Sequence, residues 1–228
     1  MTPEEGKKAA ADAALAHVKD GMKLGLGTGS TAKHFVDGVG GLVARGMQLT
    51  CVPTSEVTRA QAEGLNIPLS TLDALGSLDL TVDGADELDD GLRLIKGGGG
   101  ALLREKIVAS ASLEMIVIAD ATKHVEMLGA YPLPIEVVEF GASATIAALT
   151  KVCTDLGLSG EIVLRQSNGA VFKTDSGNQI YDCHLGQIPE PEKLASALKA
   201  ICGVVEHGLF IGLAARAYIG TSDGIKTL

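Results

Sequence analysis

Short apolar runs alternate with helical patterns along the first half of the chain. Runs of strand length lie at 22–26, 48–52, 78–82, 92–95 and 115–119. Strands that alternate with helices at this spacing form βαβ units, which build a parallel sheet covered by helices on both faces. The chemistry of such a sheet lies in the loops that leave the carboxyl ends of its strands. Those loops are therefore the first place to look for a function.

The pattern changes near Tyr131, where prolines interrupt it. The strands and helices that follow have the order β-α-β-β-α-β, which is typical of ferredoxin-like domains. The last apolar segment, 214–219, is expected to return to the first domain. The sequence thus predicts an α/β protein with a Rossmann-like parallel-sheet domain at 1–130 plus 208–228 and a smaller ferredoxin-like α+β domain at 131–207.

Composition excludes several classes of function. The formal net charge is −9, and the chain has seven aromatic residues with no tryptophan, so binding to bulk nucleic acid or to an anionic membrane surface is disfavoured. No apolar stretch reaches the roughly 18 residues of a membrane span, and the N-terminus lacks the apolar core of a secretory signal. The four cysteines and five histidines are scattered, with no metal-binding spacing. We expect a cytoplasmic protein that needs no metal.

A glycine-rich loop, Gly27–Thr31 (GTGST), follows the first strand and opens a helix. Glycines let the backbone approach a ligand, and the free N–H groups of a helix N-terminus attract an anion. The loop also matches a dinucleotide fingerprint, which requires an acid at the end of the next strand, but no carboxylate precedes Glu56 there. A turn with no ligand is the third interpretation. For a terminal phosphate monoester, the expected binding residues are Thr28, Gly29, Ser30 and Thr31.

An acidic turn, Asp83–Glu87 (DGADE), follows the third strand of the predicted sheet. Three carboxylates within five residues repel one another, and such clusters often mark functional sites. Gly84 and Ala85 are small enough to leave room for a substrate beside Asp83 and Asp86. A solvated turn is an equally good interpretation of this motif alone, because Asp and Gly are common turn residues.

Glycine is in excess, with 29 residues where about 7% is usual, and four of them are consecutive. Such a run is costly to order, so it is expected where the backbone passes close to a ligand. Lys96 precedes it and can stabilise a developing oxyanion. Glu105 lies one turn into the next helix; alone, it fits an acid that complements the helix macrodipole. Lys123, after a later strand, either reaches an anion or is a surface lysine.

At these motifs the sequence resembles the type A ribose-5-phosphate isomerase family. The resemblance covers almost the whole chain and is most specific at Gly27–Thr31, Asp83–Glu87 and Lys96–Lys106 (KGGGGALLREK). Leu103 stands where the family usually has threonine. The resemblance implies interconversion of ribose 5-phosphate and ribulose 5-phosphate without metal or organic cofactor, in a homodimer or dimer of dimers that acts in the pentose phosphate pathway. The expected partner is a phosphorylated pentose.

The resemblance also implies roles for individual residues. Thr28–Thr31 would hold the phosphate, and Glu105 would accept the carbon-bound proton. The sugar would be lined by Asp83, Gly84, Ala85, Asp86, Lys96, Gly97, Gly98 and Gly99, with Lys123 nearby. As a mechanistic hypothesis, Lys96 stabilises the enediolate, Asp83 opens the furanose ring, and Asp86 orients Lys96 or a hydroxyl. We therefore expect three loops that are distant in the chain to converge on one substrate.

Two other functions stay open from the sequence alone. A sugar-phosphate sensor uses a related fold, but it usually carries a basic helix-turn-helix segment, which the acidic N-terminus does not offer. An NAD(P)-dependent dehydrogenase is less favoured, because the acid that binds the ribose hydroxyls is missing.

Overall fold

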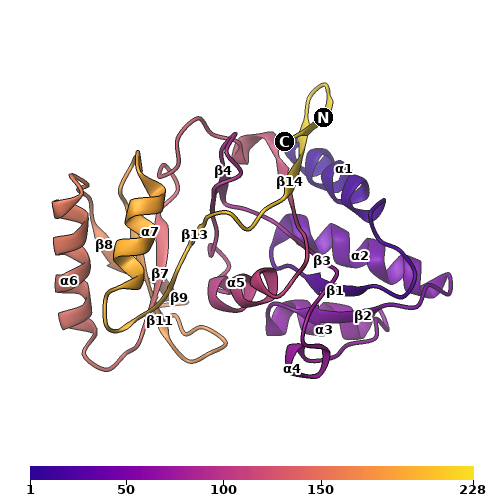
Figure 1. Cartoon of the computed structure of the whole chain (residues 1–228), viewed down its shortest axis with the longest axis horizontal. Helices are drawn as coiled ribbons and strands as arrows, with labels where there is room; N and C mark the ends of the chain where they lie inside the picture. The colour runs from indigo at the N-terminus through magenta and orange to yellow at the C-terminus, as the bar shows by residue number, and fades with distance from the viewer. The chain divides into compact units, whose positions relative to one another are not determined.

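The computed structural model describes residues 1–228 and divides the chain into two compact units (Figure 1). The first unit consists of Met1–Ala85, Arg104–His124 and Gly212–Leu228. The second consists of Asp86–Leu103 and Val125–Ile211. No helix is both long enough and apolar enough to cross a membrane.

A six-stranded sheet forms the centre of the first unit, in the order β15-β14-β6-β3-β1-β2. The five strands from β14 to β2 are parallel, and only β15 runs antiparallel to its neighbour. The predicted parallel sheet is therefore confirmed, and so is the return of the C-terminal segment to it. The strands are β1 (Lys23–Leu26), β2 (Thr50–Pro53), β3 (Leu80–Asp83), β6 (Met115–Asp120), β14 (Arg216–Thr221) and β15 (Gly224–Thr227).

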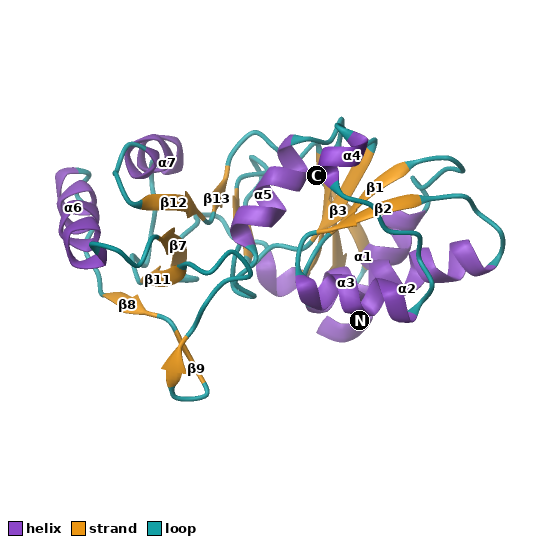
Figure 2. Cartoon of the chain, turned by 90° about the horizontal axis from the view of Figure 1, so that it is seen from below, coloured by secondary structure: helices purple, strands orange, loops and turns teal.

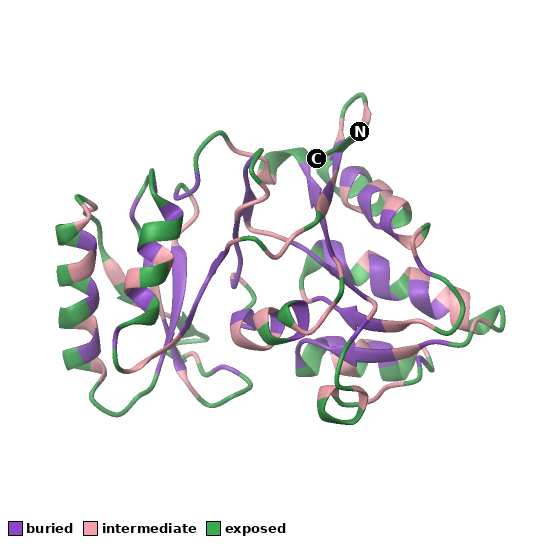
Figure 3. Ribbon diagram, in the orientation of Figure 1, coloured by how far each residue is buried: buried purple, intermediate pink, exposed green.

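Helices cover both faces of this sheet (Figure 2). Leu24 and Leu26 of β1 join an apolar cluster that includes buried residues of α1 (Pro3–Leu15) and α2 (Ser30–Ala44). On the opposite face, an apolar cluster joins β2 to α4 (Leu72–Leu75) and α5 (Leu102–Ser110). Figure 3 shows α1 and α2 buried on one side and exposed on the other. The remaining helical elements are α3 (Glu56–Gly64) and the 3₁₀ turn η1 (Ala121–Lys123).

The ends of α1 illustrate how local sequence sets a boundary. Thr2 accepts a hydrogen bond from the Glu5 N–H, and the Glu5 carboxylate accepts one from the Thr2 N–H, which is a capping box. Gly21 was expected to end this helix, but the helix ends at Leu15. Gly21 instead turns the chain into β1, because glycine readily adopts its φ of 82°. Its N–H donates to the carbonyl of Gln48, just before β2.

A four-stranded antiparallel sheet forms the centre of the second unit, in the order β12-β7-β11-β8. Leu149 of one helix and Leu194 and Leu198 of the other pack with strand residues in one apolar cluster. This is the predicted ferredoxin-like arrangement, with the hairpin β9–β10 inserted after β8. The elements are β7 (Leu133–Val137), α6 (Ala142–Asp155), β8 (Ile162–Leu164), β9 (Gln166–Ser167), β10 (Ala170–Val171), β11 (Gln179–Cys183), α7 (Pro191–Lys199) and β12 (Val204–His207).

The boundary between the units differs from the predicted one. Residues 92–95 were expected to join the parallel sheet, and 86–103 to belong to the first domain. Instead, a small antiparallel sheet pairs β5 (Leu94–Ile95) with β4 (Glu87–Leu88) and β13 (Leu209–Phe210). The second unit therefore contains 86–103, 125–130 and 208–211, which were all expected in the first domain. Backbone hydrogen bonds rather than sequence distance decide which strands associate.

Candidate active site

The loops expected to bind substrate in the first unit leave one edge of the parallel sheet. Leu26, the last residue of β1, is in register with Val82 on one side and Pro53 on the other. The Gly27 N–H donates to the Val82 carbonyl at 3.0 Å, so the glycine loop begins directly beside the acidic turn. Carboxyl ends of parallel strands form the usual ligand-binding edge of such sheets.

Asp83 and the glycine loop are in direct contact. Oδ1 of Asp83 accepts hydrogen bonds from the N–H groups of Thr28 (3.0 Å) and Gly84 (2.7 Å), and Asp83 is fully buried. A Cβ on Gly27 would lie 2.2 Å from that Oδ1 and 2.6 Å from the Asp83 Cα. Only glycine allows this approach, because the obstructing atoms include backbone. The first carboxylate of the acidic turn is thus held by the glycine loop.

The Thr28 hydroxyl makes its contacts inside the protein. It lies 2.7 Å from the hydroxyl of Thr54, 2.8 Å from that of Ser55 and 3.0 Å from that of Thr58. Thr58 also donates to the Gly27 carbonyl at 3.0 Å. We expected Thr28 to offer its hydroxyl to a phosphate; in the structure this hydroxyl lies among three others, and the Thr28 N–H donates to Asp83. The loop is therefore shaped in advance by hydroxyls that follow β2.

The groups of this loop that remain for an anion are those at the start of α2. Gly29, at φ 120°, is the N-cap, and no side chain caps the helix, so its first-turn N–H groups have no side-chain cap. Ser30 is exposed and Thr31 is nearly buried, at 8% exposure, and both lie in the first helical turn. A hydroxyl pair beside free N–H groups and the positive end of a helix dipole suits a phosphate.

Glu105 is only 4% exposed, although it lies in the first turn of α5. A carboxylate that merely complements the helix macrodipole works equally well in solvent, so burial favours the functional interpretation of Glu105. Its neighbour Arg104 has a different contact: Nη1 donates to Glu56 at 2.7 Å and lowers the pKa of that carboxyl.

Lys123 lies just after the carboxyl end of β6, in the same sheet as β1 and β3. The strand β6 ends at Asp120, whose carboxylate accepts the Thr122 N–H at 2.9 Å and so starts the turn η1. Because β6 pairs with β3, through Val117 and Asp83, this turn leaves the sheet beside the acidic turn. Lys123 is half-buried at its end.

In the second unit, Asp86 holds the run of glycines. Its Oδ2 accepts the Gly98 N–H at 2.7 Å. A Cβ on Gly98 would lie 2.4 Å from the Tyr131 hydroxyl and 2.7 Å from Oδ1 of Asp86, so any other residue there would displace these two side chains. Burial and the negative charge of Asp86 raise the pKa of Tyr131. Sequence reasoning missed Tyr131, since a single tyrosine just before Pro132 gives no signal.

Lys96 is 2% exposed, which is rare for lysine. Its Nζ lies 5.6 Å from the centre of the Phe210 ring, within the range of a cation–π interaction. Its N–H donates to the Gly208 carbonyl at 2.8 Å, and a Cβ on Gly208 would lie 2.3 Å from the Lys96 oxygen. The backbone and the side chain of Lys96 are therefore both fixed.

Glu87, the third carboxylate of the acidic turn, has a structural position. Its two oxygens accept the N–H groups of Gly129 and Tyr131, and the residue is buried. The three carboxylates of the acidic turn therefore have different contacts. Asp83 contacts the loop at 27–31, Asp86 contacts the run of glycines, and Glu87 contacts the segment before β7.

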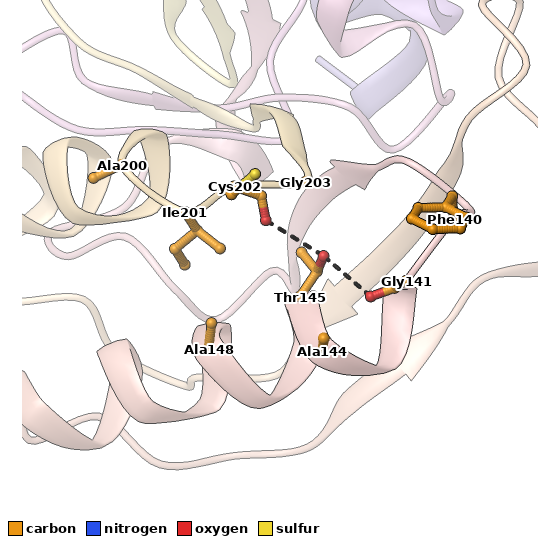
Figure 4. Close-up of a pocket in the computed structure, with 9 residues that line it drawn as sticks. All are labelled: Phe140, Gly141, Ala144, Thr145, Ala148, Ala200, Ile201, Cys202 and Gly203. Atoms are coloured by element: carbon orange, nitrogen blue, oxygen red, sulfur yellow. Dashed lines mark hydrogen bonds between the residues drawn. The ribbon is translucent and has the colours of Figure 1, made fainter.

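A separate cavity of about 600 Å³ lies in the second unit between α6 and the segment that follows α7 (Figure 4). Its only side-chain hydroxyl, that of Thr145, donates to the carbonyls of Cys202 (3.4 Å) and Gly141 (3.5 Å). None of the predicted site residues lines it, and it has no ionisable group except the Cys202 thiol. Its lining consists of Phe140, Gly141, Ala144, Thr145, Ala148, Ala200, Ile201, Cys202 and Gly203.

Comparison with known proteins decides the family. The family model described as ribose 5-phosphate isomerase A (phosphoriboisomerase A) matches residues 50–224. The protein named ribose-5-phosphate isomerase A of Rhodopseudomonas palustris strain HaA2 is 58% identical over all of this chain and 99% of its own length. The chain belongs to the ribose 5-phosphate isomerase A family. The Sinorhizobium medicae member is 57% identical over all of this chain and 99% of its own length.

Solved structures of the ribose 5-phosphate isomerase A family agree with this fold. The structure of ribose 5-phosphate isomerase from Plasmodium falciparum is 38% identical, with a TM-score of 0.93 over 99% of this chain and 98% of that one. Ribose 5-phosphate isomerase A from Methanocaldococcus jannaschii is also 38% identical, with a TM-score of 0.91 over 100% and 99%. The α/β fold with its parallel-sheet core is that of the family.

Proposed function

We propose that this chain is an aldose–ketose isomerase that interconverts D-ribose 5-phosphate and D-ribulose 5-phosphate through an enediolate, in the non-oxidative branch of the pentose phosphate pathway. The observation that carries the proposal is full-length similarity, at 55–58% identity, to proteins named ribose-5-phosphate isomerase A. A family structure 36% identical to this chain is described as a complex with phospho-erythronic acid, a phosphorylated four-carbon sugar acid. A phosphorylated pentose is the corresponding substrate here.

We assign the proton transfers to the buried charged groups. Glu105 removes the proton from C2 of the open-chain aldose and returns it to C1, while a hydroxyl proton moves from O2 to O1. The C–H bond beside a carbonyl is a weak acid, so the negative charge of the enediolate must be stabilised as it forms. Lys96 and the N–H groups of the glycine run supply that stabilisation.

The two aspartates serve the sugar oxygens in this proposal. Asp83 opens the furanose ring by taking the O1 proton; the C1–O1 double bond forms as the bond from C1 to the ring oxygen breaks, and Asp83 then gives the proton to the ring oxygen. Asp86 orients the glycine run through the Gly98 N–H and binds a sugar hydroxyl. Gly84, Ala85, Gly97 and Gly99 line the sugar as small residues, and Lys123 contributes positive charge. No step in this scheme uses a metal or an organic cofactor.

An assay with purified protein tests the proposed function. Ribose 5-phosphate is supplied, and ribulose 5-phosphate is measured with and without a chelator and with no nicotinamide added. We expect full turnover in both conditions. Binding without turnover would support a sugar-phosphate sensor instead, and turnover that requires NAD(P) would support a dehydrogenase.

Replacing Thr31 by alanine tests the phosphate end of the site. The phosphate does not change during the reaction, so its contacts stabilise substrate and transition state alike, and we expect KM to rise more than kcat falls. Steady-state kinetics measure both constants. Thr150→Ala, which removes a hydroxyl that binds only the Ile146 carbonyl on exposed α6, is the matched control. An unchanged KM in Thr31→Ala would contradict the assignment of this loop.

We further propose a cytoplasmic homodimer or dimer of dimers. Four free cysteines suit a reducing compartment, and family membership supports self-association.

A further inference from the structure

We propose that Arg165 is a positioning residue for the isomerisation, because it fixes the loop Lys96–Gly100, called the 96–100 loop below. The inference rests on the proposed function, since this loop takes part in catalysis only if the protein binds and isomerises a pentose phosphate. Arg165 directly follows β8, and it stands 67 and 68 positions away from the two loop residues that it contacts. It belongs to none of the motifs that carry the family resemblance.

Arg165 contacts the loop through its guanidinium group. Nη1 donates to the Gly97 carbonyl at 2.8 Å and to the Gly98 carbonyl at 3.2 Å. From the other side of the peptide unit, Asp86 accepts the Gly98 N–H at 2.7 Å. The peptide groups around Gly98 are thus held from both ends, which sets the direction in which the neighbouring N–H groups point.

The guanidinium is itself fixed in orientation. Nε donates to one oxygen of Asp182 at 2.8 Å, and Nη2 donates to the other. This two-point ion pair uses the planar fork of arginine, and the exposed fractions of the two side chains are only 14% and 19%. Lysine can replace the charge but not this geometry, since a single ammonium cannot bind both carboxylate oxygens and the loop carbonyls in the same directions.

Phe172 connects the same arginine to the far end of the loop. Its ring centre lies 5.8 Å from the guanidinium carbon. A Cβ on Gly100 would lie 2.4 Å from the ring, so the ring packs directly on the glycine backbone. The Phe172 N–H donates to the Arg165 carbonyl at 2.9 Å, which ties the two residues together. Arg165 and Phe172 therefore restrain the loop at both ends.

The loop needs such restraint because of its composition. Consecutive glycines lose more conformational freedom on ordering than any other residues. Gly97 and Gly100 adopt φ values of 112° and 81°, in the left-handed region, and glycine leaves this region readily when nothing holds it. A misplacement of about 1 Å can cost roughly 10²-fold in rate, so a loop that carries oxyanion donors must be held in place.

Hydrogen exchange in the full-length protein tests the restraint without substrate. In Arg165→Lys, we expect the amides of 97–101 to exchange about tenfold faster or more, since a local opening becomes easier. Asp182→Asn, which weakens the ion pair while leaving the arginine, should show a smaller effect in the same peptide. Arg216→Lys is the matched control, because Arg216 pairs with Glu114 at 3.0 Å far from this loop in the sequence and in a different unit.

Kinetics then test the effect on the reaction. In Arg165→Lys we expect kcat to fall about 10- to 100-fold while KM changes less, since the phosphate contacts lie elsewhere. In Arg165→Ala, added methylguanidine should restore part of kcat, and methylamine at the same concentration should not. A residue with only a structural role would lower thermal stability and would show no such selective rescue.

The outcomes separate the two proposals. Unchanged exchange at 97–101, or faster exchange with kcat within twofold of the unaltered protein, would overturn the role of Arg165. An unaltered protein that does not isomerise ribose 5-phosphate would overturn the proposed function, and the exchange data would still decide whether Arg165 holds the loop. Should Arg165→Ala not fold, Arg165→Lys and Asp182→Asn decide the question.

Discussion

Replacing Glu105 by glutamine is expected to lower kcat by about 10²–10⁴, the usual contribution of a general base. Glutamine has the shape of glutamate but cannot take up a proton from carbon. Glu105 is buried in the first turn of α5, so an isosteric replacement preserves the packing better than alanine would. Substrate binding should be little changed, because glutamine keeps the shape of the side chain and only the later proton transfer needs the carboxylate. The measurements are kcat from steady-state kinetics and Kd for ribose 5-phosphate from calorimetry.

Isotope exchange makes this test specific for the carbon-bound proton. In deuterated water the unaltered enzyme should introduce deuterium from solvent into the sugar, and Glu105→Gln should lose this exchange in parallel with kcat. Glu63→Gln is the control, because it makes the same chemical change at an exposed position of α3. A kcat within tenfold of the unaltered enzyme, with normal exchange, would assign the base to another residue.

The sequence was sufficient to predict the parallel sheet because each strand is a short apolar run between helical patterns. The contact between Gly27 and Asp83 follows from that prediction once β1 and β3 are neighbours, since both residues lie where their strands end. The pairing of β5 with β13 could not be found in this way. Strand β5 is two residues long, and its partner lies more than a hundred positions later, so only tertiary hydrogen bonding selects it.

The same difference between local and tertiary information applies to the residues of the candidate site. Residue types and spacing indicated Asp83 and Lys96, which follow predicted strands, whereas Glu105 was indicated only in combination with them and by the family resemblance. The direction of the Thr28 hydroxyl could not be predicted, since it depends on three hydroxyl groups that follow β2. One signal was present there: Thr54 and Ser55 directly follow a strand of the same sheet. Arg165 gave no signal, because a single arginine after a strand resembles any surface residue.

Replacing Lys96 by methionine should lower kcat by about 10²–10³, the usual cost of losing one group that stabilises an oxyanion. Methionine keeps the length and much of the volume of the side chain, so it can fill the buried space beside Phe210. It carries no charge, so the enediolate loses its cation. The Kd for substrate should change much less, because the substrate carbonyl is neutral and the charge develops only along the reaction.

A charged analogue separates stabilisation of the enediolate from simple binding. Phospho-erythronic acid, the ligand of a related structure, carries a carboxylate whose delocalised negative charge resembles that of the enediolate oxygens. Its Kd should rise in Lys96→Met by nearly the factor by which kcat/KM falls, while Kd for ribose 5-phosphate rises little. Lys193→Met, at an exposed position of α7, is the control. Equal weakening of analogue and substrate would mean that Lys96 contributes uniform binding, and the enediolate would then need another source of positive charge.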